Sequence, residues 1–263
     1  MKIVKWLFYI LIVVVIIIVG IGVSTRMEGN RMYEKYASYT KEVLEKNYNL
    51  KSSPVKEEYQ RIAYPKGFPL FNISVTSFQS DRLGKINSLD ATMFFCMKMF
   101  TLMIRPDYGY NLPVLSVDFI FTPFGGRVYV IEVIDPAKIP DENKKTYYDK
   151  MKARVPEVAM FESSGERDWF KDFVTDFSIH KKTDRKNDDL LFDIYKTYLN
   201  AYIDMAKNAK PLSPENSAKL KQGLETYVST LLSKGGPAVD VFNKILGPEK
   251  QQEYIRSVMF GID

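Results

Sequence analysis

Two apolar runs joined by a glycine-rich turn stand near the middle of the chain, in NLPVLSVDFIFTPFGGRVYVIEVIDP at residues 111–136. Residues 116–121 and 127–134 have the branched and aromatic composition of strands, and residues 123–126 separate them with Pro-Phe-Gly-Gly. Glycine supplies the positive φ that tight hairpin turns require. The stretch therefore predicts an antiparallel hairpin. Because both runs are largely apolar on both faces, we expect helices to cover each side of the sheet.

Other strand-like stretches lie on both sides of this hairpin. Residues 72–78 alternate between polar and apolar types, residues 91–104 form a long run rich in methionine and aromatics, and residues 173–180 alternate in part. The methionines and aromatics between Met93 and Phe100 are typical of core rather than of a pocket lining. Together these stretches predict an antiparallel sheet of several strands.

Helical spacing of apolar residues dominates beyond residue 138. Ser213 followed by Pro214 predicts an N-cap and a first helical position. The expected helices cover residues 141–153, 188–207, 219–232 and 237–246, with a last one through Tyr254 and Val258. The predicted fold class is α/β: a three-layer α-β-α sandwich with a central antiparallel sheet, preceded by one N-terminal transmembrane helix.

The expected transmembrane helix rests on residues 6–25, a run of 20 residues without a charge. At 1.5 Å per residue such a run crosses a hydrocarbon layer of about 30 Å. A cleaved signal peptide is the alternative, but the run is longer than the usual apolar region of about 7 to 15 residues, and no A-x-A cleavage site follows it. We therefore expect an uncleaved, single-pass anchor.

The side of the membrane follows from the charges that flank this run. More cations follow the run than precede it, which favours a cytosolic main domain, although short basic starts also tend to stay inside, so the orientation stays open. The cations are Lys2 and Lys5 before the run and Arg26, Arg31, Lys35 and Lys41 after it.

The spacing of apolar residues over 32–50 predicts an amphipathic helix next to the membrane. A linker punctuated by Ser52-Ser53-Pro54 and Pro65-Lys66-Gly67 follows it. We therefore divide the chain into a transmembrane anchor at 1–26, a juxtamembrane helix and linker at 27–69, and an α/β/α domain at 70–263.

One cysteine and one histidine in 263 residues restrict the possible chemistry. Cys96 cannot form an internal disulfide, and a zinc cage needs four ligands, so we expect no metal site. A Ser-His-Asp triad would have to use His180, which we expect at the surface, at the polar end of a strand. Without Lys2 and Lys5 the chain has 35 cations against 32 acids, interleaved along the sequence, which excludes nucleic-acid binding.

Asp118 is the candidate proton donor. It stands between Val117 and Phe119 in an apolar run, where burial should disfavour the carboxylate and raise its pKa. A carboxylic acid that stays protonated near neutral pH can give a proton to a reduced substrate. The alternative is an aspartate that faces water at a strand end or caps a turn.

The order of these landmarks along residues 70–263 resembles the ferredoxin-dependent bilin reductases, which reduce linear tetrapyrroles. The pieces that carry the resemblance are, in chain order, Arg105-Pro106, residues 111–118, residues 130–136, Trp169, residues 176–178, residues 209–212, residues 236–238, residues 246–248 and residues 254–260. No single piece is specific, and the colinear series carries the similarity.

The resemblance implies an enzyme without a tightly bound cofactor. Reduced ferredoxin would deliver single electrons to a linear tetrapyrrole held between sheet and helices, and side chains would supply protons. The family's catalytic aspartate corresponds to Asp118. Arg105 and Arg127 are candidate substrate contacts, because a guanidinium pairs with propionate groups, although an arginine beside a hairpin turn is also typical of a solvated surface.

Two positions depart from the family pattern and are further candidates for substrate contact. Many members have a histidine or asparagine seventeen residues before the aspartate, where this chain has Thr101, and members tend to have an aspartate directly before Pro-Ala, where it has Gly236. Asp240 lies four residues further on and is no evident substitute.

Three functions follow as alternatives. The first is a membrane-anchored reductase of a linear tetrapyrrole or a related conjugated compound. The second is a non-catalytic, membrane-anchored protein that binds a tetrapyrrole or another hydrophobic ligand, because the acids expected at Thr101 and Gly236 are missing. The third is a membrane-tethered scaffold whose pocket is filled by its own side chains.

Overall fold

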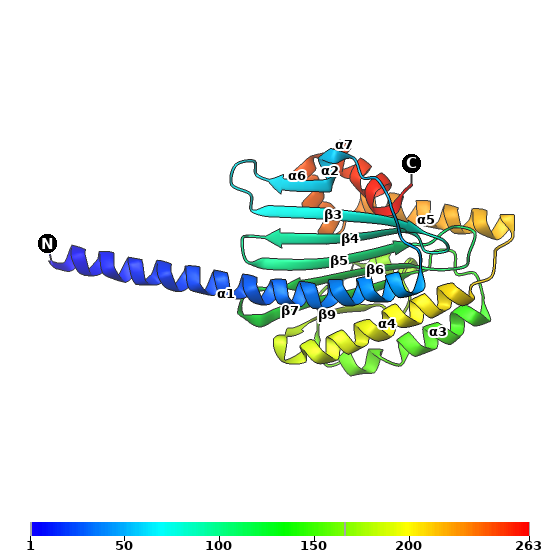
Figure 1. Ribbon diagram of the computed structural model, residues 1–263, viewed down its shortest axis with the longest axis horizontal. Coiled ribbons are helices and arrows are strands. Elements are labelled where there is room, and N and C mark those ends of the chain that lie inside the picture. The colour runs from blue at the N-terminus through cyan, green and yellow to red at the C-terminus, as the bar shows by residue number, and fades with distance from the viewer. Residues whose placement is uncertain (1, 166, 263) are drawn as a thin grey trace.

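A computed structural model describes residues 2–165 and 167–262 of the chain. Over these residues a single antiparallel sheet has the strand order β1-β3-β4-β5-β6-β7-β9-β8, with β2 paired to β3 (Figure 1). The strands are β1 Lys51–Ser52, β2 Arg61–Tyr64, β3 Phe71–Ser80, β4 Gly84–Met93, β5 Met97–Arg105, β6 Val114–Phe121, β7 Gly126–Ile134, β8 Glu162–Ser163 and β9 Ile179–Asp184. The hairpin predicted over residues 116–134 is formed by β6 and β7, which pair from Val114 with Ile134 to Phe121 with Arg127.

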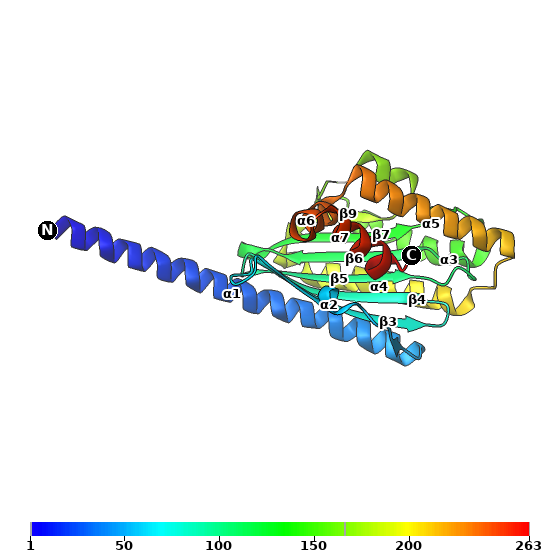
Figure 2. The same cartoon turned by 90° about the horizontal axis from the view of Figure 1, so that it is seen from above.

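Helices cover both faces of the sheet, so the predicted α-β-α layering is confirmed (Figure 2). One face packs against α1, α3 and α4, and the other against α5, α6, α7 and the π-helical turn η5. The helices are α1 Lys2–Asn47, α2 Glu57–Gln60, α3 Glu142–Lys152, α4 Asp188–Asn208, α5 Pro214–Lys234, α6 Pro237–Leu246, α7 Pro248–Glu253 and η5 Tyr254–Phe260. Short 3₁₀ turns are η1 Pro123–Gly125, η2 Val155–Val158, η3 Asp168–Asp172 and η4 Arg185–Asn187. Ser213 caps α5 as predicted, because its side chain accepts a hydrogen bond from the Asn216 amide.

Two predicted strands differ from the structure. The run over residues 91–104 is divided into β4 and β5 by a turn, in which Phe94 and Phe95 adopt φ values of 49° and 66°. The strand predicted over residues 173–180 begins only at Ile179. Before it, Val174 makes a single isolated bridge to Ile134 and is not part of a strand. An aromatic run without glycine, proline or asparagine gives no turn signal, so both boundaries depend on contacts between distant segments.

The helix predicted over residues 32–50 is the second half of the continuous helix α1, and it belongs to the core. Met32, Tyr36, Val43 and Leu44 are buried against the sheet and α4. The Tyr36 ring lies 4.6–6.1 Å, centroid to centroid, from five other aromatic rings, those of Phe100, Phe119, Phe121, Phe192 and Tyr195. The second half of α1 is therefore fixed to the domain rather than lying beside it.

Arg127 ties α1 to the sheet and to α4. Its guanidinium donates to Glu28 of α1 at 2.5 Å and to both carboxylate oxygens of Asp188 at 2.7 and 2.8 Å. The arginine is buried and both acids are largely buried. Removal of one partner from such a group would leave an unpaired buried charge and destabilise the protein. The three side chains therefore fix α1 to β7 and α4.

Among the described residues, no helix is both long and apolar enough to cross a membrane. Residue 1 and the side chains of residues 2–5, 7–9 and 15–19 lie outside what the structure describes. They fall within the predicted anchor at residues 1–26, which therefore stays a prediction.

Tyr36→Ala should remove much of the contact between α1 and the sheet. We expect the free energy of unfolding to fall by about 3–5 kcal/mol, the usual cost of deleting a large buried aromatic ring, as measured by denaturant unfolding. Lys41→Ala is the control, because its side chain is 72% exposed on the same helix, and it should change stability by less than about 0.5 kcal/mol. Equal effects of the two substitutions would show that α1 does not belong to the core.

Candidate active site

Polar side chains of four neighbouring strands gather on the sheet face that α5 and α6 cover. Thr101 of β5 is directly opposite Asp118 of β6, Asp118 is opposite Val130 of β7, and Val130 is opposite His180 of β9. Paired residues of adjacent strands project from the same face, and so do residues two apart on one strand. Glu132 of β7 therefore joins Thr101, Asp118 and His180 on this face.

Asp118 lies in surroundings that favour its neutral form. The Thr101 hydroxyl donates a 2.5 Å hydrogen bond to Asp118 Oδ1. Burial raises the pKa of Asp118 above its usual value, and the hydrogen bond from Thr101 opposes this rise. Burial is the larger effect, so the carboxyl group keeps its proton to a higher pH than an exposed aspartate does.

His180 is not at the surface, and that prediction was wrong. Its Nε2 atom lies 3.7 Å from Oε1 of Glu132, and the two side chains are only 10% and 12% exposed. The residue looks terminal along its own strand, but β9 pairs with β7 and carries the imidazole onto the site face. Glu132 was not singled out in the sequence, since a charged residue within an apolar strand gives no sign of its partner.

Tyr227 approaches this polar group from α5. Burial raises the pKa of its phenol well above the usual value, and the nearby Glu132 and Asp118 carboxyls raise the pKa further. The ring also packs at 5.4–6.4 Å from four aromatic rings, those of Trp169, Phe170, Phe173 and Phe260. The helical layer over the carboxyls is therefore largely aromatic.

The site face is less tightly covered than the opposite one. Val117, Phe119 and Ile131 point to the α1 side and are fully buried. Asp118 and its neighbours on the site face, Ile120, Val128 and Val130, keep partial exposure. A half-buried apolar strip beside a carboxylic acid is a surface on which a flat, apolar molecule can lie against the sheet.

The other predicted site residues do not all meet at Asp118. Arg105 is on the same face, but it lies four residues along β5 from Thr101, about 13 Å away, and it donates to the Phe260 carbonyl at 2.8 Å. Gly236 precedes α6 in the layer above the site, and a Cβ atom there would lie 3.9 Å from the Phe170 ring. Arg127 projects from the opposite face, where Glu28 and Asp188 hold it.

Within the described residues, no group of three or more histidine, cysteine, aspartate or glutamate side chains is placed to hold a metal ion. The structure thus defines a protein with a protonatable carboxyl on a sheet face, beneath an aromatic helical layer. A carboxylic acid so placed can give a proton to a molecule that contacts this face of the sheet.

Comparisons with known proteins agree with this class. The family model described as ferredoxin-dependent bilin reductase matches residues 37–261, so the chain belongs to the ferredoxin-dependent bilin reductase family. The chain is 25% identical over 244 residues to phycoerythrobilin:ferredoxin oxidoreductase of Gloeobacter violaceus, covering 88% of this chain and 96% of that protein. It is 21% identical over 238 residues to 15,16-dihydrobiliverdin:ferredoxin oxidoreductase of Nostoc punctiforme, covering 87% and 95%.

The fold is also that of a solved structure. Phytochromobilin synthase from tomato, crystallised in complex with biliverdin, superposes with a TM-score of 0.74 at 17% sequence identity, covering 87% of this chain and 83% of that one. The expected family membership is therefore confirmed, and the match begins at residue 37, inside α1.

Asp118→Asn should change how stability depends on pH. The pKa of Asp118 is raised in the folded state, so its contribution to stability is present below the unfolded pKa of about 3.9 and is lost as the pH rises through the folded pKa. Asparagine does not titrate. We therefore expect the melting temperature of the variant, relative to the unsubstituted protein, to be higher at pH 8 than at pH 4. A difference that does not change with pH would mean that Asp118 is solvated.

Proposed function

We propose that this protein reduces a linear tetrapyrrole with electrons from reduced ferredoxin, and that Asp118 donates the proton. The observation that carries the proposal is the half-buried Asp118 carboxyl, which Thr101 holds by a 2.5 Å hydrogen bond on the sheet face beneath α5. Membership of the family and the names of the relatives support the substrate class and the electron donor.

The chemistry needs two electrons and two protons for each carbon–carbon double bond that is reduced. Ferredoxin gives one electron at a time, so the bilin first becomes a radical anion. The neutral carboxylic acid of Asp118 transfers its proton to that anion and becomes a carboxylate, which is reprotonated from water before the second electron and proton are taken up. A raised pKa of Asp118 favours the acid form that this step requires.

Thr101 has a positioning role in this proposal. Many family members have a histidine or asparagine at this position. The threonine hydroxyl cannot act as an acid at neutral pH. Its hydrogen bond holds the Asp118 carboxyl through Oδ1. One acid then serves the reaction, and it is held in a single orientation.

Asp118→Asn tests the proton donor. The variant should bind biliverdin with nearly unchanged affinity, seen as a shifted visible band, and should lose about 10²–10⁴-fold in turnover by reduced ferredoxin, the usual contribution of a general acid. Asp240→Asn is the matched control, because this carboxylate is half-exposed and paired with Arg167, and its turnover should not change.

Two results would decide against this function. Failure of the unsubstituted chain to bind biliverdin at micromolar concentration would overturn the proposal. Stoichiometric binding without turnover would establish the second alternative, a tetrapyrrole-binding protein that has no reductase activity.

We also propose that residues 1–26 anchor the chain in a membrane, with the domain on the cytosolic side. The 20 uncharged residues at 6–25 support this, as do side chains of α1 that face solvent, such as Trp6, Leu11 and Val13. The first half of α1 extends beyond the domain (Figure 1). A cytosolic domain would also meet ferredoxin, which is an intracellular reductant.

Val14→Arg tests the anchor, because an arginine in the middle of a membrane helix costs about 2.5–3.5 kcal/mol on insertion. The unsubstituted chain should sediment with membranes and resist extraction by alkaline carbonate, whereas a fraction of the variant should be released. Met160→Arg, on the exposed surface of the domain, should behave like the unsubstituted chain. Complete release of the unsubstituted chain by carbonate would overturn the anchor.

A further inference from the structure

Large apolar side chains are exposed at one end of the sheet. Apart from the first 27 residues of the chain, the described residues expose Tyr64, Phe68, Phe94, Phe95, Phe124 and Met160. The five aromatic ones lie on the β2–β3, β4–β5 and β6–β7 turns or, for Tyr64, at the end of β2, and we call them the aromatic end. Phe124 is 84% exposed and Phe68 is 69% exposed.

These turns are neighbours in space. Phe71, after the first turn, pairs with Met93, before the second, and Lys98, after the second, pairs with Phe121, before the third. The rings of Phe68 and Phe95 contact each other across two turns, at 4.9 Å between centroids. The aromatic end is therefore one surface assembled from three turns. It lies at the ends of the strands, on the side of the domain from which α1 extends (Figure 1).

The backbone of these turns is unfavourable for the residues that occupy it. Phe94, Phe95 and Phe124 have φ values of 49°, 66° and 62°. Glycine and asparagine are the usual residues in this left-handed region, whereas a bulky aromatic residue is a genuine outlier. An exposed apolar ring and a strained backbone occur at the same three positions, and backbone strain of this kind clusters at functional sites.

Helix α1 determines what this end faces. The uncharged run ends at Thr25, and Thr25 is itself buried. Glu28, one turn later, pairs with Arg127, and a Cβ atom at Gly29 would lie 2.7 Å from the Lys98 side chain. Because α1 continues without a break through this point, no flexible linker separates the predicted anchor from the domain.

We propose that the aromatic end is a lipid-binding surface that rests in the headgroup region of the membrane that holds α1. This rests on the anchor proposed above and goes beyond the reductase function. A helix fixed at both Thr25 and Gly29 holds the turns at the depth where the uncharged run leaves the bilayer. Aromatic side chains at that depth bury their rings among the acyl chains.

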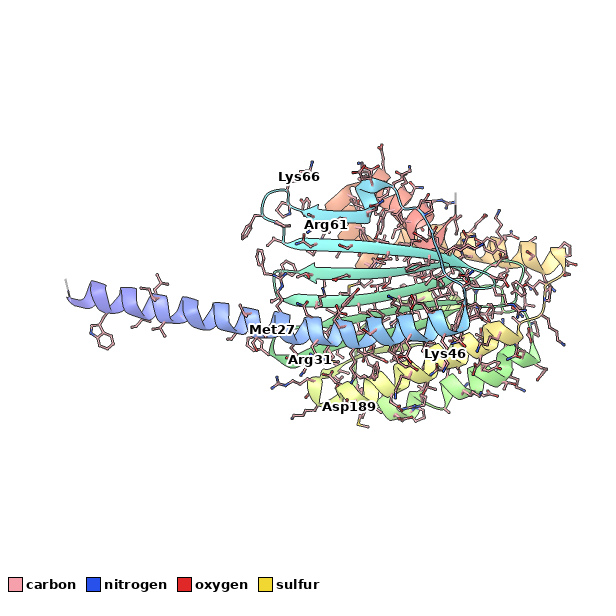
Figure 3. All side chains as sticks on the ribbon, viewed as in Figure 1. Met27, Arg31, Lys46, Arg61, Lys66 and Asp189 are labelled. Carbon is pink, nitrogen blue, oxygen red and sulfur yellow. The ribbon has the colours of Figure 1, made fainter. Side chains whose placement is uncertain are left out.

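Cations surround the aromatic end, which suits a surface with anionic lipids. Arg26, Lys66 and Arg185 are exposed there together with one acid, Asp184, while Glu28 is paired with Arg127 and lies 3.7 Å from Arg185. Met27 and Lys66 lie at the end of the domain from which α1 extends (Figure 3). Protruding rings on three turn tips suit a fluid lipid surface, whereas a peptide would need a continuous groove.

The single cysteine provides a probe at this surface. Cys96 follows Phe95 in the β4–β5 turn and is partly exposed. The full chain, labelled at Cys96 with a polarity-sensitive fluorophore and reconstituted in vesicles of phosphatidylcholine and phosphatidylglycerol, should show a blue-shifted emission and quenching by nitroxide-bearing lipids. The control is Asp81→Cys in a Cys96→Ser background, because Asp81 is exposed in the β3–β4 turn at the opposite end. That label should remain unquenched.

Asparagine substitution separates lipid contact from folding. Phe94→Asn, Phe95→Asn and Phe124→Asn together suit the positive φ values, so the melting temperature should be maintained or raised. Quenching at Cys96 should decrease, because the rings no longer draw the turns among the acyl chains, while the chain still floats with the vesicles.

Each remaining outcome would overturn the proposal. If the unsubstituted chain floats with vesicles but its Cys96 label is quenched no more than the Asp81→Cys label, the lipid-binding surface is wrong and the anchor stands. A blue shift without lipid quenching would assign the aromatic end to contact between protein molecules. A chain that does not float at all would overturn the anchor and the surface together, and would leave the biliverdin assays of the reductase function unaffected.

Discussion

The docking of α1 against one face of the sheet is the contact on which the rest of the molecule depends. Tyr36 packs among five aromatic rings from β5, β6 and α4, and Arg127 joins α1, β7 and α4 through two largely buried carboxylates. These contacts complete one core. A sheet that is fully covered on that side can leave its other face only partly covered without losing a single stable fold.

The alternation of side chains along each strand then divides the chemistry between the two faces. On β6 and β7, Phe119 and Arg127 belong to the face that α1 and α4 cover, which we call the closed face. Asp118 and Glu132 belong to the site face, which α5 and α6 cover. On the closed face, the buried Arg127 is paired with the carboxylates of Glu28 and Asp188. The site face carries the Asp118 carboxyl, whose pKa is raised by burial and which accepts a hydrogen bond from the Thr101 hydroxyl.

The departures from the family pattern have a consistent physical meaning in this arrangement. Thr101 donates a hydrogen bond to the Asp118 carboxyl, and Gly236 caps the start of α6 without a side chain. The pair formed by His180 and Glu132 adds polar groups that the sequence did not indicate. A rigid α1 would also hold the site and the aromatic end in fixed positions relative to a membrane.

The sequence alone determined the features that depend on local pattern. It predicted the β6–β7 hairpin, the helices of the second half, the Ser213 cap, the layered α/β class and the burial of Asp118, because turn chemistry and apolar spacing act within about ten residues. Only the tertiary structure divided residues 91–104 into two strands, brought His180 beside Glu132 and placed Arg127 on the face away from Asp118. These results depend on which strands pair and in which register, and residues far apart along the chain decide both.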